Sequence, residues 1–210
     1  TLKDIALEKA AIIKEKAPVV TSVSHQEPLQ VIKNACRKKN VPLYILNKDF
    51  YFYRLRCQRN KQFFCYQGLK DGLQNLKISL LGKHQLANAS LALACLELLS
   101  DTFKIAEEDI RAGLDSTFWP GRLEVVKREP LVVLDGAHNI GAMLALKKAV
   151  QDHFHYEKLI LVLGVLEDKD IRGMLLPIIP LAQKIIITTP ARPRAARPRR
   201  ATSCTRAAPG

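Results

Sequence analysis

The sequence has no apolar run long enough to cross a bilayer, which argues against a membrane-spanning protein. Its longest apolar stretch surrounds residues 159–165 and has the length of a strand. The chain also opens without the basic segment and apolar stretch of a secretory signal. Aromatic residues make up only 6%, so any core must consist mainly of Leu, Ile, Val and Ala. We therefore expect a cytoplasmic protein without membrane contact.

Cysteine is sparse as well, with five widely spaced residues and no C-x-x-C pair. An odd number in this arrangement excludes a zinc ribbon and disfavours a disulfide framework, as expected in a reducing compartment. His153 and His155 are the only other pair with metal-like spacing. Because no Cys is near them, they are more typical of a solvated helix end, and we predict no metal ligand in this chain.

The formal charge of +13 is unevenly distributed. Six arginines fall in the last nineteen residues, and subtracting them leaves +7 for the body of the chain. Residues 191–210 are rich in Arg, Pro and Ala without apolar periodicity, so we expect a disordered and non-native tail. A basic nucleic-acid-binding module is one alternative, but no alternation of aromatic and basic residues is expected on a sheet face. We therefore expect no nucleic-acid partner.

Hydrophobic periodicity predicts an α/β fold with a change of pattern in the middle. Helices are expected at residues 1–14, 28–39, 87–100, 107–114, 140–154 and 171–181. Strands are expected at residues 19–21, 41–46, 123–129, 131–136, 159–164 and 184–188, and antiparallel strands between residues 50 and 81. Pro120 and Gly121 interrupt this periodicity, so residues 117–122 are the expected domain boundary.

Three segments carry residues suited to ligand chemistry. Asp135 follows an apolar strand, so we expect it at the carboxyl end of a parallel strand, where α/β sheets bind ligands. It could accept from ribose hydroxyls, orient a basic partner or merely cap the next helix. Arg122 could bind a phosphate with two hydrogen bonds, or be a solvated turn residue. Asn88, in the expected first helical turn, could contact a purine edge or act as a capping residue.

These segments together resemble one family. GKHQLANASLALA (82–94), FWPGRLEVV (118–126) and LVVLDGAHN (131–139) have the order and spacing of folylpolyglutamate and dihydrofolate synthases, a branch of the Mur ligase superfamily. The opening TLKDIALEKAAIIK is similar to the family's T-L-x-x-I-A-x-E-K-A-G-I-I-K segment, with Ala11 in place of Gly. VLGVLEDKD (162–170) resembles a further stretch of the family. The resemblance covers roughly residues 1–194.

The resemblance implies an ATP-dependent carbon–nitrogen ligase acting on folates. ATP would phosphorylate the γ-carboxylate of a folate, or the carboxylate of dihydropteroate, and the amine of L-glutamate would displace phosphate from the acyl phosphate. It implies a monomer that uses ATP and Mg²⁺, with K⁺ as a further candidate ion. Another Mur-type amino-acid ligase is the alternative within the superfamily, but the W-P-G-R-L-E and E-K-A segments favour the folate branch.

Site residues follow from the same resemblance. It implies that Asn88 contacts adenine, that Arg122 binds the phosphates, and that Asp135 holds the ribose or the arginine–phosphate arrangement. His138 would lie on the same nucleotide-facing loop. Lys9 matches the lysine that the family carbamylates to support magnesium; without the family it would be an exposed helical lysine. We also expect Glu8 to lie on a different helix face from Lys9.

The family's phosphate-binding loop, of G-x-x-x-x-G-K-[ST] type, does not occur in these 210 residues. The resemblance therefore predicts a C-terminal fragment that is inactive alone. Residues 1–117 would be the second half of a P-loop-type central ATPase domain. Residues 118–190 would form the Rossmann-like α/β C-terminal domain.

Overall fold

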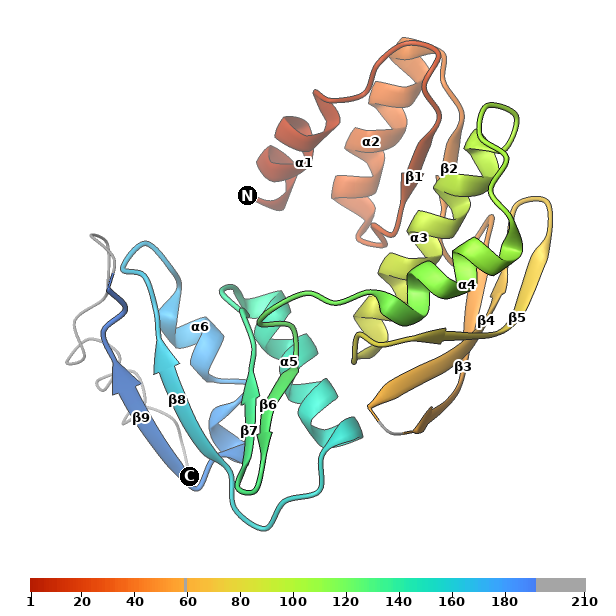
Figure 1. Ribbon diagram of the computed structural model, residues 1–210. Helices are drawn as coiled ribbons and strands as arrows, with labels where there is room; N and C mark the ends of the chain where they lie inside the picture. The colour runs from red at the N-terminus through yellow and green to blue at the C-terminus, as the bar shows by residue number, and fades with distance from the viewer. Residues whose placement is uncertain (59, 192–210) are drawn as a thin grey trace. The chain divides into compact units, whose positions relative to one another are not determined.

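A computed structural model describes residues 1–58 and 60–191, and it is mixed α/β, as predicted (Figure 1). The chain forms two compact units. Unit 1 comprises Thr1–Ser79 and His84–Phe118, and unit 2 comprises Leu80–Lys83 and the chain from Trp119 onward. The step from Phe118 to Trp119 falls inside the expected boundary segment. The tail prediction falls on residues outside the described ones, except for residue 191.

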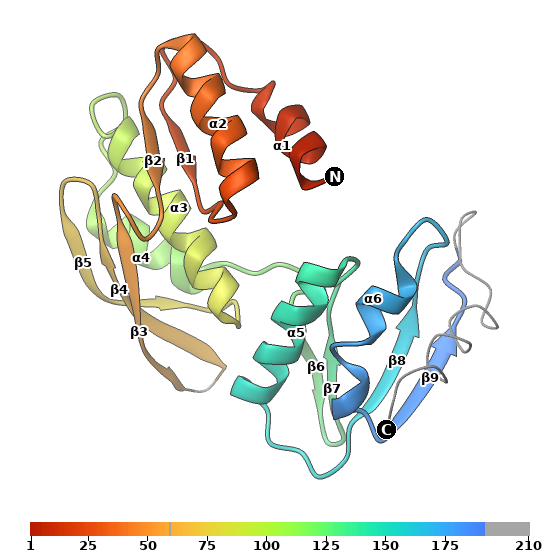
Figure 2. The same ribbon diagram turned by 180° about the vertical axis from the view of Figure 1, so that it is seen from behind.

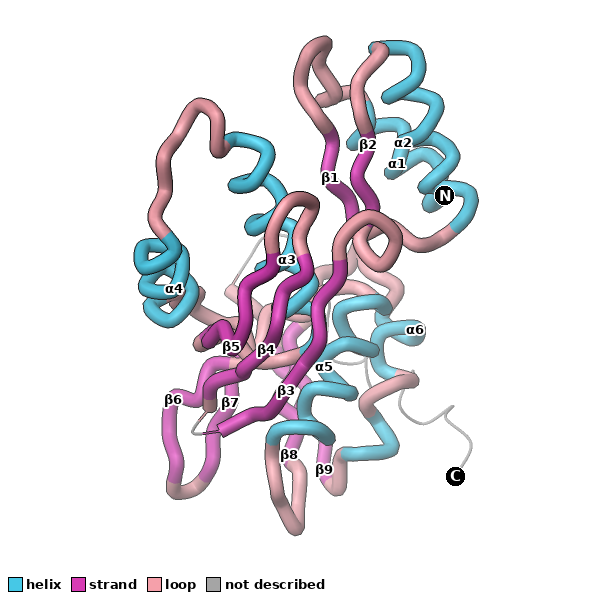
Figure 3. The backbone as a smooth tube through the Cα atoms, turned by 90° about the vertical axis from the view of Figure 1, so that its right-hand side faces the viewer, coloured by secondary structure: helices cyan, strands magenta, loops and turns pink. Residues whose placement is uncertain are grey.

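After helix α1 (Leu2–Ala10), unit 1 continues with a β-α-β arrangement, which confirms the alternation expected there. Strands β1 (Val19–Thr21) and β2 (Leu43–Ile45) pair in parallel, and helix α2 (Gln26–Lys39) connects them. Asn40 ends α2 in the left-handed conformation with φ 51°, a common way of terminating a helix. Helix α1 and helix α2 lie on the same side of this strand pair (Figure 3).

Helix α1 (Leu2–Ala10) begins as expected but ends four residues early. Thr1 caps it, because its hydroxyl accepts from the Asp4 backbone N–H while the Asp4 carboxylate accepts from the Thr1 hydroxyl and amino group. The expected apolar face is not buried: Ala6 is buried, but Leu2 and Ile5 are more than half exposed. With so little burial, extension of the helix to residue 14 gains little.

The period-two segment of unit 1 forms an antiparallel sheet in the order β3 (Tyr51–Gln58), β4 (Lys61–Gln67), β5 (Gly72–Ile78), as predicted (Figure 3). On the central strand β4, alternate side chains of Gln62, Phe64 and Tyr66 are buried. This alternation gives the sheet one face toward the core and one toward solvent.

Two helices complete unit 1, namely α3 (Lys83–Leu99) and α4 (Glu107–Ser116). Helix α3 starts four residues before the expected residue 87, directly after Gly82, which has φ 98°. Asn88 consequently lies in the second turn of α3, and the expectation of the first turn was wrong. No helix in the described part of the chain is long and apolar enough to cross a membrane.

The described residues of unit 2 form two strand pairs and two α-helices. Its elements are β6 (Glu124–Arg128), β7 (Leu131–Leu134), α5 (Ile140–His153), β8 (Ile160–Gly164), α6 (Ile171–Leu175), a 3₁₀-helix (Ile179–Leu181) and β9 (Lys184–Thr188). Strands β8 and β9 pair in parallel. Both α-helices lie on one side of the strands (Figure 2). Prolines interrupt the expected helix 171–181, which is therefore a short α-helix followed by a 3₁₀ turn.

The parallel setting expected for β7 was wrong. Within the described residues β7 pairs with β6 alone, in an antiparallel hairpin whose last pair is Arg128–Leu131. Only two residues separate the strands, whereas a parallel pair needs a crossover of a dozen residues or more. Asp135 therefore follows a hairpin strand, and Leu131 and Leu134 are more than 40% exposed.

The core of unit 2 lies between its helices and the β8–β9 pair. Met143 of α5, Met174 and Leu175 of α6, and Leu163 of β8 are buried in one cluster. Aliphatic and methionine side chains build this core, in keeping with the scarcity of aromatics.

Candidate functional site

A strained turn at Gly121–Leu123 presents Arg122 at the start of unit 2. Gly121 has φ 67° and Leu123 has φ 45°, so both residues that flank Arg122 are left-handed. A bulky residue such as Leu rarely adopts this conformation, and strain of this kind persists only where surrounding contacts enforce it. The side chain of Leu123 supplies one such contact, because it is buried against Leu81 and Ala149.

Carboxylates supply two further contacts. The Glu124 Oε2 atom accepts the Gly121 N–H at 2.8 Å, and the Asp135 Oδ2 atom accepts the Leu123 N–H at 3.0 Å. The other Asp135 oxygen accepts the Ala137 N–H at 2.8 Å. The Gly121 carbonyl accepts the Gly136 N–H at 2.8 Å. Two of these hydrogen bonds join the turn before β6 to the loop after β7, namely Leu123 N–H to Asp135 and Gly136 N–H to the Gly121 carbonyl.

The Arg122 guanidinium lies against the backbone of Gly136. A methyl group built on Gly136 would lie 3.0 Å from Arg122 Nη1. The Arg122 side chain is exposed, and no carboxylate of the described residues lies within ion-pair distance of it. A charged guanidinium with five donors and no anionic partner is suited to binding a phosphate or carboxylate of a ligand.

His138 and Asn139 continue the loop after Asp135. The His138 Nδ1 atom is 2.9 Å from the Gly136 carbonyl oxygen, and because a carbonyl only accepts, this nitrogen carries the hydrogen. The Nε2 atom of the exposed ring remains for an outside partner. Asn139, and not Asp135, caps helix α5, since its Oδ1 accepts the Ala142 N–H at 2.8 Å. The capping alternative for Asp135 was therefore wrong.

Sequence reasoning missed Glu124 and Asn139. Asn directly before an apolar-periodic segment is a standard N-cap signal and could have been recognised. Glu124 carried no such signal, because its hydrogen bond depends on the left-handed conformation of Gly121. The structure brings Arg122, Asp135 and His138 together around one turn in unit 2, whereas Lys9 and Asn88 belong to unit 1.

Lys9 is exposed in the last turn of α1. Its side chain is 74% exposed, and its Nζ atom is 3.0 Å from Glu8 Oε1. Glu8 and Lys9 are adjacent on α1 and so leave the helix on different faces, as expected, but their side chains are long enough for the charged ends to form this ion pair. The burial that would favour a neutral amine before carbamylation is not seen in the described residues. Carbamylation itself stays a prediction.

Asn88 is exposed on α3, and its Nδ2 atom donates to Gln85 Oε1 at 3.1 Å. Gln85 is buried, so this hydrogen bond fixes the Asn88 amide one turn from the start of the helix. The amide oxygen of Asn88 remains at the surface. Its predicted contact with adenine stays a prediction.

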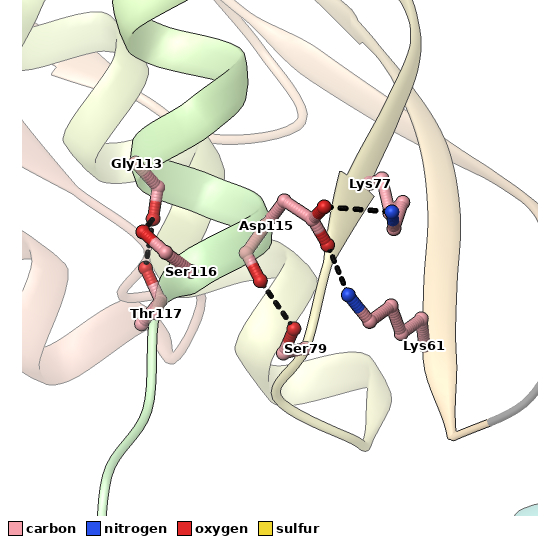
Figure 4. Close-up of polar contacts among 7 residues, drawn as sticks. All are labelled: Lys61, Lys77, Ser79, Gly113, Asp115, Ser116 and Thr117. Atoms are coloured by element: carbon pink, nitrogen blue, oxygen red, sulfur yellow. Dashed lines mark hydrogen bonds and ion pairs between the residues drawn. The ribbon is translucent and has the colours of Figure 1, made fainter.

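Two lysines share one carboxylate where unit 1 ends (Figure 4). Asp115 of α4 contacts Lys61 at 2.5 Å and Lys77 at 2.6 Å, through different carboxylate oxygens. The hydrogen bond from Lys61, followed by that from Lys77, lowers the pKa of Asp115 below its ordinary value. The Ser79 hydroxyl also donates to the Asp115 carbonyl at 2.5 Å. These contacts hold the end of α4 on the sheet just before the chain leaves unit 1.

The outer face of the antiparallel sheet carries one basic–aromatic pair that was not expected. The guanidinium carbon of Arg56 lies 4.2 Å from the centroid of the Phe63 ring. Cation–π pairs occur about once per 70–80 residues in proteins generally. One such contact is not an alternation of aromatic and basic residues, so the expectation of no nucleic-acid partner stays a prediction.

The described residues contain no group of three His, Cys, Asp or Glu side chains placed to hold a metal ion. His153 ends helix α5, and its neighbour His155 is exposed in the following loop. Cys36, Cys57, Cys65 and Cys95 are free thiols, and Cys204 lies outside the described residues.

The sequence and the fold were compared with known proteins. The family described as Mur ligase, glutamate ligase domain, matches residues 121–208. The dihydrofolate synthase/folylpolyglutamate synthase of Bacillus subtilis is 33% identical over 177 residues, which are 83% of this chain and 41% of the relative. The chain thus spans less than half the length of this curated relative.

Solved structures agree with the sequence match. The folylpolyglutamate synthase of Mycobacterium tuberculosis complexed with ADP has a TM-score of 0.91 and 29% identity, over 97% of this chain and 46% of that one. A folylpolyglutamate synthase complex with AMPPCP and folate has a TM-score of 0.86 and 25% identity, over 98% of this chain and 50% of that one.

Proposed function

Because this chain belongs to the folylpolyglutamate synthase and dihydrofolate synthase family of Mur ligases, we propose that it forms part of an ATP-dependent ligase that adds L-glutamate to folates. The observation that carries the proposal is the Arg122 turn, in which a guanidinium that pairs with no carboxylate of the described residues is held in a strained loop. The relatives complexed with ADP and with AMPPCP and folate support nucleotide and folate as ligands.

The reaction has two group transfers. A carboxylate oxygen of the substrate, from the γ-carboxylate of a folate or the single carboxylate of dihydropteroate, attacks the γ-phosphorus of ATP, and the bond from that phosphorus to the ADP oxygen breaks. The amine of L-glutamate then attacks the carbonyl carbon of this acyl phosphate, loses a proton and expels inorganic phosphate, leaving an amide. Both steps build negative charge on phosphoryl oxygens, and fixed cationic donors stabilise such charge.

Arg122 is proposed to bind nucleotide phosphates. Its exposed guanidinium has five donors, and the phosphate supplies the anion that the described protein groups do not. Asp135 is proposed to maintain the arginine–phosphate arrangement rather than to hold the ribose, because each of its oxygens already accepts a backbone N–H. His138 would offer its outward Nε2 atom to the same ligand.

Asn88 and Lys9 keep the roles that the family resemblance implies. The surface amide of Asn88 would contact adenine, and Lys9 would be carbamylated. Both proposals concern unit 1, and neither depends on the geometry of the Arg122 turn. The ligase would work as a monomer in the cytoplasm.

Magnesium and potassium remain part of the proposal through the family alone. The described residues do not offer three metal-ligating side chains in one place, so they do not by themselves fit a Mg²⁺ site. No step of the reaction is therefore derived through a metal ion bound to this chain.

Nucleotide binding by the chain tests the proposal. ADP titrated into the chain in a calorimeter should bind, and Arg122→Ala should weaken binding by about ten- to a hundredfold, since a lost hydrogen bond to a charged group is worth roughly 1.5–3 kcal/mol. Arg128→Ala, which removes an exposed arginine from the end of β6, is the matched control and should bind normally. Equal binding by wild type and Arg122→Ala would refute the phosphate role of Arg122.

A further inference from the structure

Glu124 is the first residue of β6, and its carboxylate is bound to the backbone rather than to a cation. Its Oε2 atom accepts the Gly121 N–H at 2.8 Å. No Lys, Arg or His nitrogen of the described residues forms an ion pair with it. A half-buried carboxylate is usually stabilised by a cation or by N–H donors. For Glu124 the donor is the backbone N–H of Gly121, in the Arg122 turn.

The hydrogen bond from Gly121 to Glu124 lies in the part of the turn whose backbone conformation is strained. The left-handed conformations of Gly121 and Leu123 are costly to maintain, above all at Leu123, which has a side chain. Each of these residues has its N–H held by a carboxylate, Gly121 by Glu124 and Leu123 by Asp135. The two hydrogen bonds therefore fix the backbone of the residues immediately before and after Arg122.

The same contacts keep both acids away from the arginine. Glu124 lies only two residues along the chain from Arg122, and Asp135 precedes Gly136, on which the guanidinium rests. Either carboxylate, if released from its backbone N–H, would be a nearby partner for the guanidinium. A protein carboxylate paired with Arg122 would compete directly with an anionic ligand.

We propose that Glu124 is a positioning residue for Arg122: by holding the Gly121 N–H it fixes the turn and leaves the guanidinium free for an anion. The inference rests on the proposed function in one respect, namely that the anion is a nucleotide phosphate. Glu124 acts through the backbone and does not touch the ligand.

Two substitutions separate positioning from charge. Glu124→Gln retains an oxygen that can accept the Gly121 N–H, whereas Glu124→Ala removes the acceptor. In the 210-residue chain, Glu124→Ala should bind ADP about tenfold more weakly, and Glu124→Gln should stay within about twofold of wild type, because one hydrogen bond is at stake. Glu129→Ala, an exposed acid in the hairpin turn, removes the same charge and should bind ADP normally.

A double substitution tests whether the effect passes through Arg122. In the Arg122→Ala background, Glu124→Ala should weaken ADP binding no further, since the residue being positioned is gone. Adenosine, which lacks phosphate, should bind wild type and Glu124→Ala equally. An additive loss, or an equal loss for adenosine, would overturn the positioning role in favour of general damage to unit 2.

Amide hydrogen exchange gives a readout that needs no ligand. The Gly121 amide should be protected in wild type and in Glu124→Gln and should lose protection in Glu124→Ala. Unchanged protection in Glu124→Ala would refute the inference whatever ADP does. If wild type fails to bind ADP while the Gly121 amide behaves as expected, the nucleotide proposal fails and the positioning of Arg122 by Glu124 stands.

Discussion

The Glu97 carboxylate of α3 accepts a hydrogen bond of 2.7 Å from the hydroxyl of Tyr66 on β4. The same carboxylate also accepts backbone N–H groups of Leu69 at 2.8 Å and Asp71 at 3.2 Å, in the loop between β4 and β5. One side chain on a helix thereby holds both a buried tyrosine and the turn of a hairpin. Burial of Tyr66, and then its hydrogen bond to Glu97, raises the pKa of its hydroxyl.

Glu97→Ala should destabilise unit 1 by about 2–4 kcal/mol, because it leaves a buried hydroxyl and the backbone N–H groups of Leu69, Lys70 and Asp71 without their acceptor. Tyr66→Phe removes only one of these hydrogen bonds and should cost less. Urea unfolding followed by circular dichroism measures both changes. Glu108→Ala, an exposed acid in the first turn of α4, is the control and should change stability by less than about 0.5 kcal/mol. Equal stability of Glu97→Ala and Glu108→Ala would contradict the role of Glu97.

The raised pKa of Tyr66 has a consequence at alkaline pH. A group whose pKa is higher in the folded state contributes stability below its unfolded pKa of about 10 and loses it as the pH rises above that value. Wild type should therefore lose stability above about pH 10 more steeply than Tyr66→Phe. Thermal midpoints between pH 9 and about pH 11 measure the difference. Parallel curves for the two proteins would contradict this prediction.

Asp115 gives unit 1 a sensitivity to acid with the opposite sign. Its pKa is lowered by Lys61 and Lys77, so the stability it contributes is present above its unfolded pKa of 3.8 and is lost as the pH falls below that value. Asp115→Asn should be less stable than wild type at neutral pH and should approach it in acid. Asp109→Asn, another acid on the same helix, should keep the acid dependence of wild type. A difference in unfolding free energy between Asp115→Asn and wild type that stays constant from neutral pH to below pH 3.8 would refute the prediction.

The sequence was a good guide to elements whose partners are close along the chain. The parallel pairing of β1 with β2 across α2, and the two hairpins of the β3–β4–β5 sheet, follow from local periodicity and turn residues. The apolar periodicity of β7 did not predict its environment correctly. Its four apolar residues are typical of a buried parallel strand, yet the connection of two residues to β6 dictates a hairpin.

The candidate site shows a similar division. The motif around Arg122 was recognisable from its letters, and Asp135, also named from the sequence, lies in the loop that is hydrogen-bonded to the Arg122 turn. What Asp135 does could not be predicted, because one of its two hydrogen bonds goes to the backbone N–H of Leu123, whose left-handed conformation the sequence does not indicate. Backbone conformation of this kind is set by tertiary contacts, in this case the burial of the Leu123 side chain.

The 210-residue chain alone should not catalyse ligation. Its sequence contains no G-x-x-x-x-G-K-[ST] motif, whose backbone amides and lysine would hold the β- and γ-phosphates of ATP. Incubation with ATP, magnesium, tetrahydrofolate and radiolabelled glutamate should give no labelled folate. The same assay with the complete Bacillus subtilis relative verifies the reagents. Incorporation of label by the chain on its own would refute this expectation.

Gly136→Ala should weaken ADP binding without lowering stability. The new methyl group would lie 3.0 Å from Arg122 Nη1 and 3.4 Å from the Gly121 carbonyl oxygen, closer than most side chains tolerate. The nearer contact is the end of a flexible side chain, so the guanidinium can move away at little energetic cost and the fold is preserved. Because the guanidinium is then displaced from its position against Gly136, its contact with phosphate should be lost. The affinity for ADP should fall about tenfold.

Gly141→Ala is the matched control for this substitution. Gly141 lies in the first turn of α5, and a methyl group there would have ordinary contact with Asn139 Oδ1 at 3.5 Å. Alanine in a helix is favoured over glycine by up to about 1 kcal/mol, so this variant should be at least as stable as wild type. It should also bind ADP with unchanged affinity, because it leaves the Arg122 turn intact. Calorimetric titration with ADP and thermal unfolding of both variants test the prediction. Normal ADP binding by Gly136→Ala would show that the position of the guanidinium against Gly136 does not contribute to phosphate binding.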